Sequence, residues 1–271
     1  HPTKPGLKIP QMFEAAIDKE LKGLWIIGED IVQTDPNSAH VVEAMNSLEL
    51  LVVQEIFMSE TAKLATVVLP GTTFLEKDGT FTNTERRIQR VNRAVEPLPG
   101  TKPDGLIVTE MMKKLGFDQP TYDADQVLSE IADVVPFFKG VTRERLGKLG
   151  LQWPVQEDGT DTQILHTETF KLGKGQLKNF DWKESTEIEE NQKDYPLILT
   201  TSRVLQHYNA ATMTRRTKNI NIVDEDVLLI HPKDAAHRDI NTGDIGRLYS
   251  GRGEVALKVE VTDKVKEGIV F

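Results

Sequence analysis

Acidic and amide side chains directly follow two apolar runs in the N-terminal part of the chain. Glu29 comes after the run at residues 24–27, and Gln54 and Glu55 come after the run at residues 50–53. In an open α/β sheet, ligands bind outside the carboxyl ends of the strands. Carboxylates at such a place can accept hydrogen bonds from ribose hydroxyls or purine N–H groups, so the pattern favours a nucleotide site. Helix caps or solvated loop residues are the alternative interpretation.

A second concentration of polar groups lies at residues 200–208, again after an apolar run. Hydroxyls, the guanidinium of Arg203, an amide, the imidazole of His207 and a phenol occur together there. Arginine can bind a pyrophosphate bidentately, and hydroxyls and backbone N–H groups add further donors. The segment therefore indicates either a site for a polyanionic ligand or the polar rim of a β-barrel.

Other candidate groups are less specific. Residues 85–93 carry four arginines, which could bind an anion but are also typical of an ion-paired surface. The sequence contains no GxGxxG, GxxxxGK[ST] or HExxH pattern. No spacing identifies a nucleophile with its base, so we expect no self-contained catalytic apparatus.

The composition is that of an ordinary globular protein, with 271 residues of which 38% are hydrophobic. The formal net charge of −9 disfavours binding to a nucleic-acid backbone, and no apolar run has the length of a membrane helix. There is no cysteine, which excludes disulfides and cysteine-ligated metals within these residues. Because the chain begins with His1 and ends in an apolar run, we expect it to be a piece of a longer chain.

The elements that must position these groups alternate along the N-terminal part. Helical spacing of apolar residues follows Pro10, and uninterrupted apolar runs at 24–28 and 50–53 predict strands buried on both faces, with a third strand at 66–70. Helices are expected through Val41 and Met45 and from Ser59. This rhythm predicts an α/β fold with a doubly wound, mainly parallel sheet.

The later part of the chain is predicted to differ. Asp78 and Gly79 suggest a tight turn, and residues 104–116 and 125–134 suggest helices. Strand-like runs follow at 197–200, 227–230, 245–249 and 255–261. We therefore expect an α/β domain at residues 1–180, an acidic linker at 181–194, and a partial β-barrel domain at 195–271.

Taken together and in order, several segments resemble the molybdopterin oxidoreductase family. The resemblance is carried by residues 28–30, 52–62, 65–70, 76–87, 201–208 and 212–216. The chain looks most like the C-terminal part of the alpha (catalytic) subunit of molybdenum- or tungsten-dependent formate dehydrogenases. The barrel then looks like the family's molybdopterin dinucleotide-binding domain.

The resemblance implies a specific ligand, the molybdopterin guanine dinucleotide pair (bis-MGD). Glu29, Gln54 and Glu55 would meet guanine or ribose, and Lys77 and Asp104 would complete that pocket. The barrel would contact the cofactor through a continuous segment in which Arg203 and His207 are the expected polar anchors: Thr201, Ser202, Arg203, Val204, Leu205, Gln206, His207, Tyr208, Asn209 and Ala210. No catalytic residue and no metal ligand are expected in this chain, since the family's metal ligand and [4Fe-4S] cysteines precede the region.

The implied activity is the two-electron oxidation of formate to carbon dioxide, with the molybdenum or tungsten site present only in the full-length subunit. We expect the isolated chain to be inactive. Its expected partners are the rest of its own subunit and iron–sulfur electron-transfer subunits, with no nucleic acid and no direct membrane contact. The expected compartment is the cytoplasm, or the periplasm if a twin-arginine leader precedes it. A nitrate reductase-type enzyme and a non-catalytic scaffold module of a redox complex are the alternatives.

Overall fold

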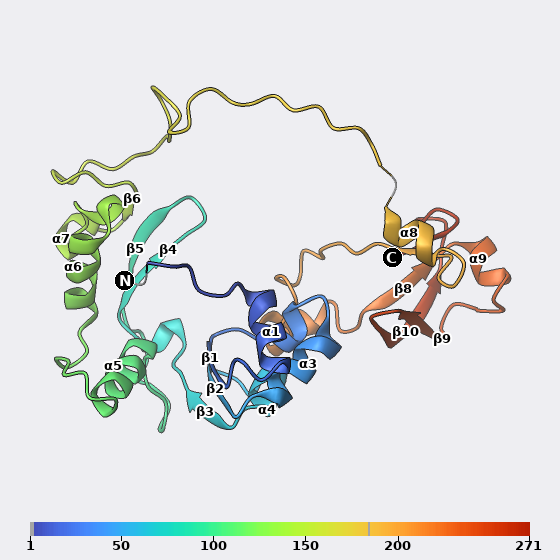
Figure 1. Cartoon of the computed structure of the whole chain (residues 1–271), viewed down its shortest axis with the longest axis horizontal. Coiled ribbons are helices and arrows are strands. Elements are labelled where there is room, and N and C mark those ends of the chain that lie inside the picture. Colours follow the sequence, from blue (N-terminus) through green and yellow to red (C-terminus); the bar gives the residue numbers. More distant parts are fainter. Residues whose placement is uncertain (1–2, 184) are drawn as a thin grey trace.

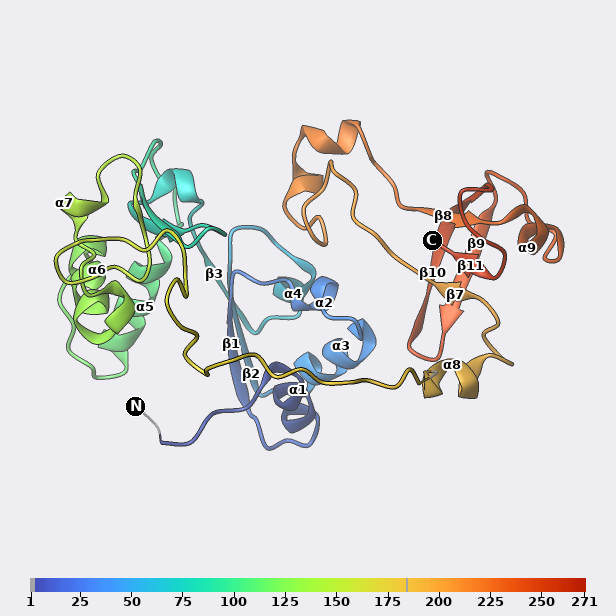
Figure 2. The same ribbon diagram turned by 90° about the horizontal axis from the view of Figure 1, so that it is seen from above.

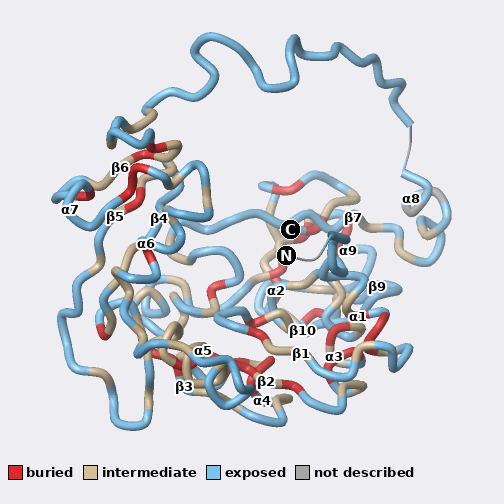
Figure 3. Tube along the Cα trace, turned by 60° about the vertical axis from the view of Figure 1, so that its left-hand side comes forward, coloured by how far each residue is buried: buried red, intermediate tan, exposed pale blue. Residues whose placement is uncertain are grey.

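The computed structural model describes residues 3–183 and 185–271. The first two residues of the expected first domain and Glu184 of the expected linker therefore lie outside the described residues. The described elements form a parallel sheet with its helices, an antiparallel sheet with its helices, and a C-terminal sheet (Figure 1). Buried residues gather in three separate clusters that correspond to these three groups (Figure 3).

The first group confirms the predicted α/β fold with a parallel sheet. Its strands are β1 (Gly23–Ile27), β2 (Leu50–Glu55) and β3 (Val67–Pro70). They run parallel in the order β1-β2-β3, with Trp25, Val52 and Val67 in register. An order that advances in one direction is the arrangement of one half of a doubly wound sheet. The helices of this group are α1 (Ile9–Ile17), α2 (Ile31–Thr34), α3 (Ser38–Ser47) and α4 (Glu60–Lys63).

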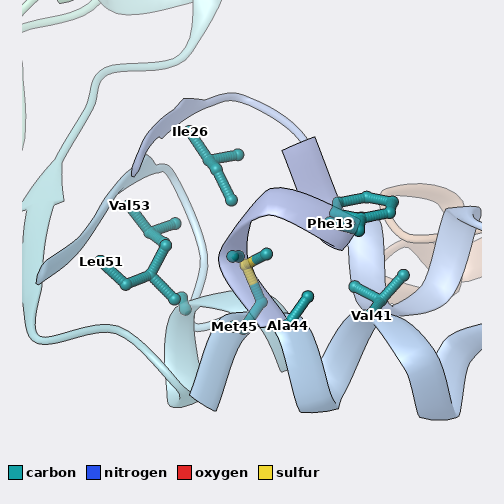
Figure 4. Close-up of a cluster of buried hydrophobic side chains, with 9 residues drawn as sticks. Phe13, Ile26, Val41, Ala44, Met45, Leu51 and Val53 are labelled. Atoms are coloured by element: carbon teal, nitrogen blue, oxygen red, sulfur yellow. The ribbon is translucent and has the colours of Figure 1, made fainter. Parts of the chain in front are cut away.

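The core of this group lies between one face of the sheet and the helices α1 and α3. Leu51 and Val53 of β2 project from the sheet toward Met45 of α3, and Phe13 of α1 lies beside Val41 of α3 in the same cluster (Figure 4). The side chain of Asn37 caps α3 by accepting a hydrogen bond from the backbone N–H of His40 at 3.4 Å. The cluster fixes the strands, and with them the loops that follow their carboxyl ends.

The opposite face of the same sheet is partly open. Side chains alternate between the two faces of a strand, so Ile27, Leu50 and Val67 point away from this core. They are 49%, 46% and 42% exposed. The prediction that the first two strands are buried on both faces is therefore wrong for the described residues, because the apolar cluster covers only one face.

The second group contains an antiparallel sheet in the order β4-β5-β6. Its strands are β4 (Gly79–Thr82), β5 (Arg87–Val91) and β6 (Leu151–Gln152). The predicted tight turn at Asp78 and Gly79 is wrong, because Gly79 already pairs with Val91 and the chain reverses at residues 83–86. The helices are η1 (Phe74–Glu76), α5 (Asp104–Lys114), α6 (Ala124–Val134), η2 (Pro136–Phe138) and α7 (Arg143–Leu146).

A long connection follows the second group. The described residues between β6 and α8 (Thr186–Asn191) contain no helix or strand, and this part of the chain forms the open arch in Figure 1. Phe180 and Trp182 of the connection are 86% and 83% exposed. Most described side chains of the stretch 181–194 are exposed, and the stretch also contains the short helix α8.

The C-terminal sheet is five-stranded, in the order β7-β11-β8-β10-β9, and curls into part of a barrel as expected. Leu228, Ile230, Val259 and Val270 form its core. Its strands are β7 (Ile198–Leu199), β8 (Val227–Ile230), β9 (Ile245–Ser250), β10 (Gly253–Val261) and β11 (Ile269–Val270). Its helices are η3 (Thr214–Arg216), η4 (Lys218–Asn221) and α9 (Pro232–Ala236). Across the described residues, no helix has both the length and the apolar character needed to cross a bilayer.

Candidate functional site

The carboxyl ends of β1 and β2 meet at a cavity of about 100 Å³, which we call the strand-end cavity. The sheet continues to its mouth, since the backbone N–H of Gly28 donates to the carbonyl of Gln54 at 2.9 Å. Glu29 and Glu55 both line this cavity, one from each strand end. Thr34 donates its hydroxyl to Glu29 Oε1 at 2.6 Å, and the backbone N–H of Ile56 donates to Glu55 Oε1 at 2.7 Å. Each carboxylate keeps acceptor capacity for a ligand donor.

Asp30 also borders the strand-end cavity, but its carboxylate serves the fold. It is 7% exposed and accepts hydrogen bonds from the backbone N–H and the hydroxyl of Thr61, at 2.9 and 2.7 Å. Its other oxygen accepts a longer bond from the backbone N–H of Glu60 at 3.3 Å. The loop after β1 is thereby fastened to the first turn of α4, which holds Glu29 in place.

The second wall of the strand-end cavity comes from the C-terminal part of the chain. Thr212, Met213 and Arg216 line it opposite the strand ends. The guanidinium of Arg216 lies 4.5 Å from the centre of the Phe57 ring, within the range of a cation–π contact. Its Nε donates to the carbonyl of Thr212 at 3.1 Å. The cavity therefore combines carboxylate acceptors on one wall with a guanidinium donor on the other.

Gln54 joins the sheet to a neighbouring network that contains Lys77 and Asp104. The Gln54 Nε2 donates to Asp104 Oδ1 at 2.8 Å, and Lys77 forms an ion pair with Asp104 Oδ2. Burial raises the pKa of Asp104, but the hydrogen bonds from Lys77 and Gln54 and the charge of Lys77 outweigh burial. The pKa of this carboxyl consequently lies below its ordinary value, and Asp104 is ionised at neutral pH.

Lys77 and Asp104 line a different cavity, of about 230 Å³, which we call the hairpin cavity. It lies between β4 and α6, and Tyr122 contributes its phenol. The ring of Tyr122 packs on Gly105, where an added Cβ would lie 2.1 Å from the ring. Burial raises the pKa of Tyr122, and the negative charge of Asp104 raises it further, so the phenol stays protonated. Of the five predicted strand-end and pocket residues, Glu29 and Glu55 thus line one cavity and Lys77 and Asp104 the other. Gln54 lines neither, but its hydrogen bond to Asp104 connects the end of β2 with the hairpin cavity.

The segment 201–210 lies in the sequence just before the residues that form the second wall of the strand-end cavity. Its own residues line neither cavity. His207 Nε2 donates to the carbonyl of Val223 at 2.8 Å, and Nδ1 lies 3.0 Å from the hydroxyl of Thr214. Arg203 donates to the side chain of Asn209. The remaining residues of the segment are exposed or half-buried: Thr201, Ser202, Val204, Leu205, Gln206, Tyr208 and Ala210.

Arginines of the cluster at residues 85–93 make contacts within the protein. Arg86 donates to the backbone carbonyls of Trp153, Thr162 and Gln163, the last two at 3.0 and 2.9 Å. Arg87 pairs with Glu85 at 3.5 Å. Since Arg86 binds three carbonyls, it holds the start of the long connection against β5 and is not free for an anion.

Comparison with protein families identifies the fold and its ligand class. Residues 1–114 match the family model for molybdopterin oxidoreductases, and residues 197–271 match the model for the molybdopterin dinucleotide-binding domain. This chain belongs to the molybdopterin oxidoreductase family. One wall of the strand-end cavity lies within the first matched region, and the wall around η3 lies within the second.

The relatives of this molybdopterin oxidoreductase chain include formate dehydrogenase alpha subunits. It is 42% identical to the F420-dependent formate dehydrogenase subunit alpha of Methanocaldococcus jannaschii, over 98% of this chain and 40% of that protein. It is 40% identical to a putative formate dehydrogenase of Staphylococcus aureus, over 97% of this chain and 27% of the relative. The chain thus spans two-fifths or less of these relatives. The acetylene hydratase of Pelobacter acetylenicus shares the fold, with a TM-score of 0.70 at 21% identity, over 96% of this chain and 38% of that one.

The residues of the two cavities fit the dinucleotide of a molybdopterin cofactor chemically. Nucleobase N–H groups and ribose hydroxyls need acceptors, which Glu29 and Glu55 present at the strand ends. The Oε1 atom of Gln54 is buried and has no hydrogen-bond partner. A pyrophosphate needs donors, and Arg216 offers one from the facing wall. No role is assigned to Phe57 or Arg216 from the sequence alone, although both lie in segments that carry the family resemblance, 52–62 and 212–216.

Proposed function

We propose that this chain is the cofactor-binding part of a molybdenum- or tungsten-dependent formate dehydrogenase catalytic subunit. The observation that carries the proposal is the strand-end cavity, where Glu29 and Glu55 face Arg216 across a space bordered by both family-matched regions. The similarity to formate dehydrogenase alpha subunits supports formate as the substrate.

In this proposal the two carboxylates accept hydrogen bonds from the guanosine end of bis-MGD. Lys77 and Asp104, with Gln54 bonded behind them, form an adjoining polar surface, and residues 201–210 contact the cofactor from the barrel side. When bound, the cofactor supplies the metal at which formate loses two electrons and becomes carbon dioxide. The contribution of these residues is to bind and orient the dinucleotide, which is the usual division of labour in cofactor enzymes.

The remaining parts of such an enzyme must come from other residues. The chain has no cysteine, so thiolate ligands for the metal or for [4Fe-4S] clusters would belong to other segments of the full-length subunit or to partner subunits. We therefore propose that the chain has no formate-oxidising activity alone and works with iron–sulfur electron-transfer subunits in the cytoplasm. Dye reduction by these 271 residues with formate would contradict this.

The test uses the full-length protein purified from its native source or expressed with its cofactor machinery. Mass spectrometry of the denatured protein measures bound molybdopterin guanine dinucleotide. We expect the dinucleotide in the unmodified protein, and about a tenfold loss of affinity for it in Glu29→Gln and in Glu55→Gln, as for a hydrogen bond to a charged group. Glu43→Gln, an exposed carboxylate of α3, is the matched control and should keep it. Absence of the dinucleotide from the unmodified protein would contradict the proposal, as would nitrate replacing formate as the substrate.

A further inference from the structure

The two walls of the strand-end cavity come from parts of the chain that are separate in sequence. One wall follows β1 and β2, and the other is formed by residues 212–216 around η3. Figure 2 shows the segment that carries η3, in orange, extending away from the C-terminal sheet toward α2 and α4. The cavity exists only while this segment is docked against the strand ends.

The contact between Phe57 and Arg216 joins the two walls directly. Phe57 is 38% exposed and projects from the loop after β2, with the guanidinium of Arg216 at 4.5 Å from its ring centre. Apolar aromatic faces attract arginine through the ring quadrupole and through dispersion. The contact therefore opposes undocking of η3 even though both residues are at the surface.

The position of Arg216 also fixes its neighbours in the wall. Its side chain bonds to the carbonyl of Thr212, and its backbone N–H donates to the carbonyl of Met213 at 3.0 Å. The backbone N–H of Arg215 donates to the carbonyl of Ala211 at 3.0 Å, and Ala211 is 5% exposed. The short 3-10 turn thus moves as a unit with Arg216.

We propose that Arg216, besides offering a donor to the cavity, has a positioning role: its stack on Phe57 is a clasp which holds η3 against the strand ends so that the strand-end cavity is complete. The identity of the nucleotide rests on the proposed function, but the clasp itself rests on the geometry. A ligand that touches both walls stabilises the docked position of η3. Docking of η3 raises the affinity for that ligand by the same factor, because the two equilibria are coupled. Loss of the clasp should consequently weaken docking and nucleotide retention together.

The substitutions that test the clasp remove the stacking of Arg216 on Phe57 while keeping the positive charge at residue 216 or the apolar side chain at residue 57. Arg216→Lys keeps the charge but loses the planar guanidinium, and Phe57→Leu keeps an apolar side chain but loses the ring. Each should raise hydrogen exchange at the amides of residues 215–217, and lower dinucleotide retention during gel filtration, by roughly two- to fivefold. The double variant should be no worse than Arg216→Lys alone, which also loses the bond to Thr212, because both substitutions remove the same stacking contact.

Two further variants of the full-length protein provide the controls. Phe57→Tyr keeps the aromatic face and should behave as the unmodified protein. Arg215→Gln breaks bonds to Asp226 Oδ2 at 2.8 Å and to the carbonyl of Asp224 at 3.1 Å, both within the barrel part. In the double variant with Phe57→Leu, the effects of the two substitutions on hydrogen exchange should be additive, because they break separate contacts.

The outcomes distinguish the clasp from the proposed function. If the unmodified protein carries no dinucleotide, the proposed function fails, while exchange at residues 215–217 still tests the clasp. If the dinucleotide is present but Phe57→Leu and Arg216→Lys have additive effects or no effect on exchange, the clasp is refuted and the proposed function stands. Failure of Phe57→Tyr to match the unmodified protein would also overturn the clasp.

Discussion

Asp30 and Glu29 are adjacent carboxylates at the end of β1, and the structure gives them opposite roles. Asp30 is buried and fastens the loop after β1 to Thr61 of α4, whereas Glu29 is exposed and lines the strand-end cavity. We predict that Asp30→Ala destabilises the α/β part strongly, and that Glu29→Gln leaves its stability nearly unchanged.

The magnitude follows from the bonds that Asp30→Ala removes. Two bonds of 2.9 and 2.7 Å to Thr61 and a longer one of 3.3 Å to Glu60 are lost, and a hydrogen bond to a charged group contributes about 1.5–3 kcal/mol. The Thr61 hydroxyl still accepts from the backbone N–H of Val32 at 3.1 Å, which limits the cost. We therefore expect a loss of about 3 kcal/mol, or a melting point lower by about 6–12 °C. Glu29→Gln should cost less than about 0.5 kcal/mol.

Scanning calorimetry of the full-length protein measures both values, and hydrogen exchange at residue 61 locates the change. The amide of Thr61 should lose protection in Asp30→Ala and keep it in Glu29→Gln. The reasoning would be refuted by a melting point of Asp30→Ala within 2 °C of the unmodified protein, a shift of roughly half a kcal/mol. Equal destabilisation by the two substitutions would refute it as well, because the assigned roles would then be indistinguishable.

Two further predictions concern the second group of elements. Because the pKa of Asp104 is lowered in the folded state, its pair with Lys77 stabilises the fold above the ordinary carboxyl pKa of about 3.9, and this contribution disappears as the pH falls through the lower folded-state value. Acid titration of unfolding should show this loss, and Asp104→Asn should remove it; an unchanged acid profile would contradict the assignment. Gly140→Ala should destabilise the protein by about 2 kcal/mol or more, because the added Cβ would lie 1.6 Å from the carbonyl oxygen of Gln156. Gly175→Ala, where no atom lies within 4 Å, is its control, and equal melting points for the two variants would disprove the packing argument.

The order and type of the main elements could be predicted from the sequence. Continuous apolar runs became β1, β2 and β3 because each has a side that packs on α1 and α3. Periodicity could not reveal that Ile27 and Val67 face an open side, since an apolar strand looks the same whether one face is covered or both. The turn at Asp78 and Gly79 was misplaced because the reversal at residues 83–86 depends on the register with β5.

The candidate site was predictable only in part, and for a similar reason. Glu29 and Glu55 share one cavity because parallel strands end on the same edge, which is a general rule that sequence can invoke. Lys77 and Asp104 adjoin that site through Gln54, but they open into another cavity because β4 and α6 lie on their far side. The facing wall of Arg216 depends on tertiary docking across a long stretch of sequence, which no local pattern encodes.

The long connection between β6 and α8 has a thermodynamic consequence for the clasp. Beyond the start that Arg86 holds, a flexible chain of about 20 residues spans roughly 25 Å, so the two parts it joins meet at an effective concentration on the order of millimolar. A single arginine–aromatic contact could not hold two free proteins together, but as an intramolecular contact it needs to overcome far less entropy. Cutting the chain in this exposed arch, near Phe180 and Trp182, would turn a first-order docking equilibrium into a bimolecular one. The two pieces would then reassemble in a concentration-dependent manner, as the halves of a split protein do.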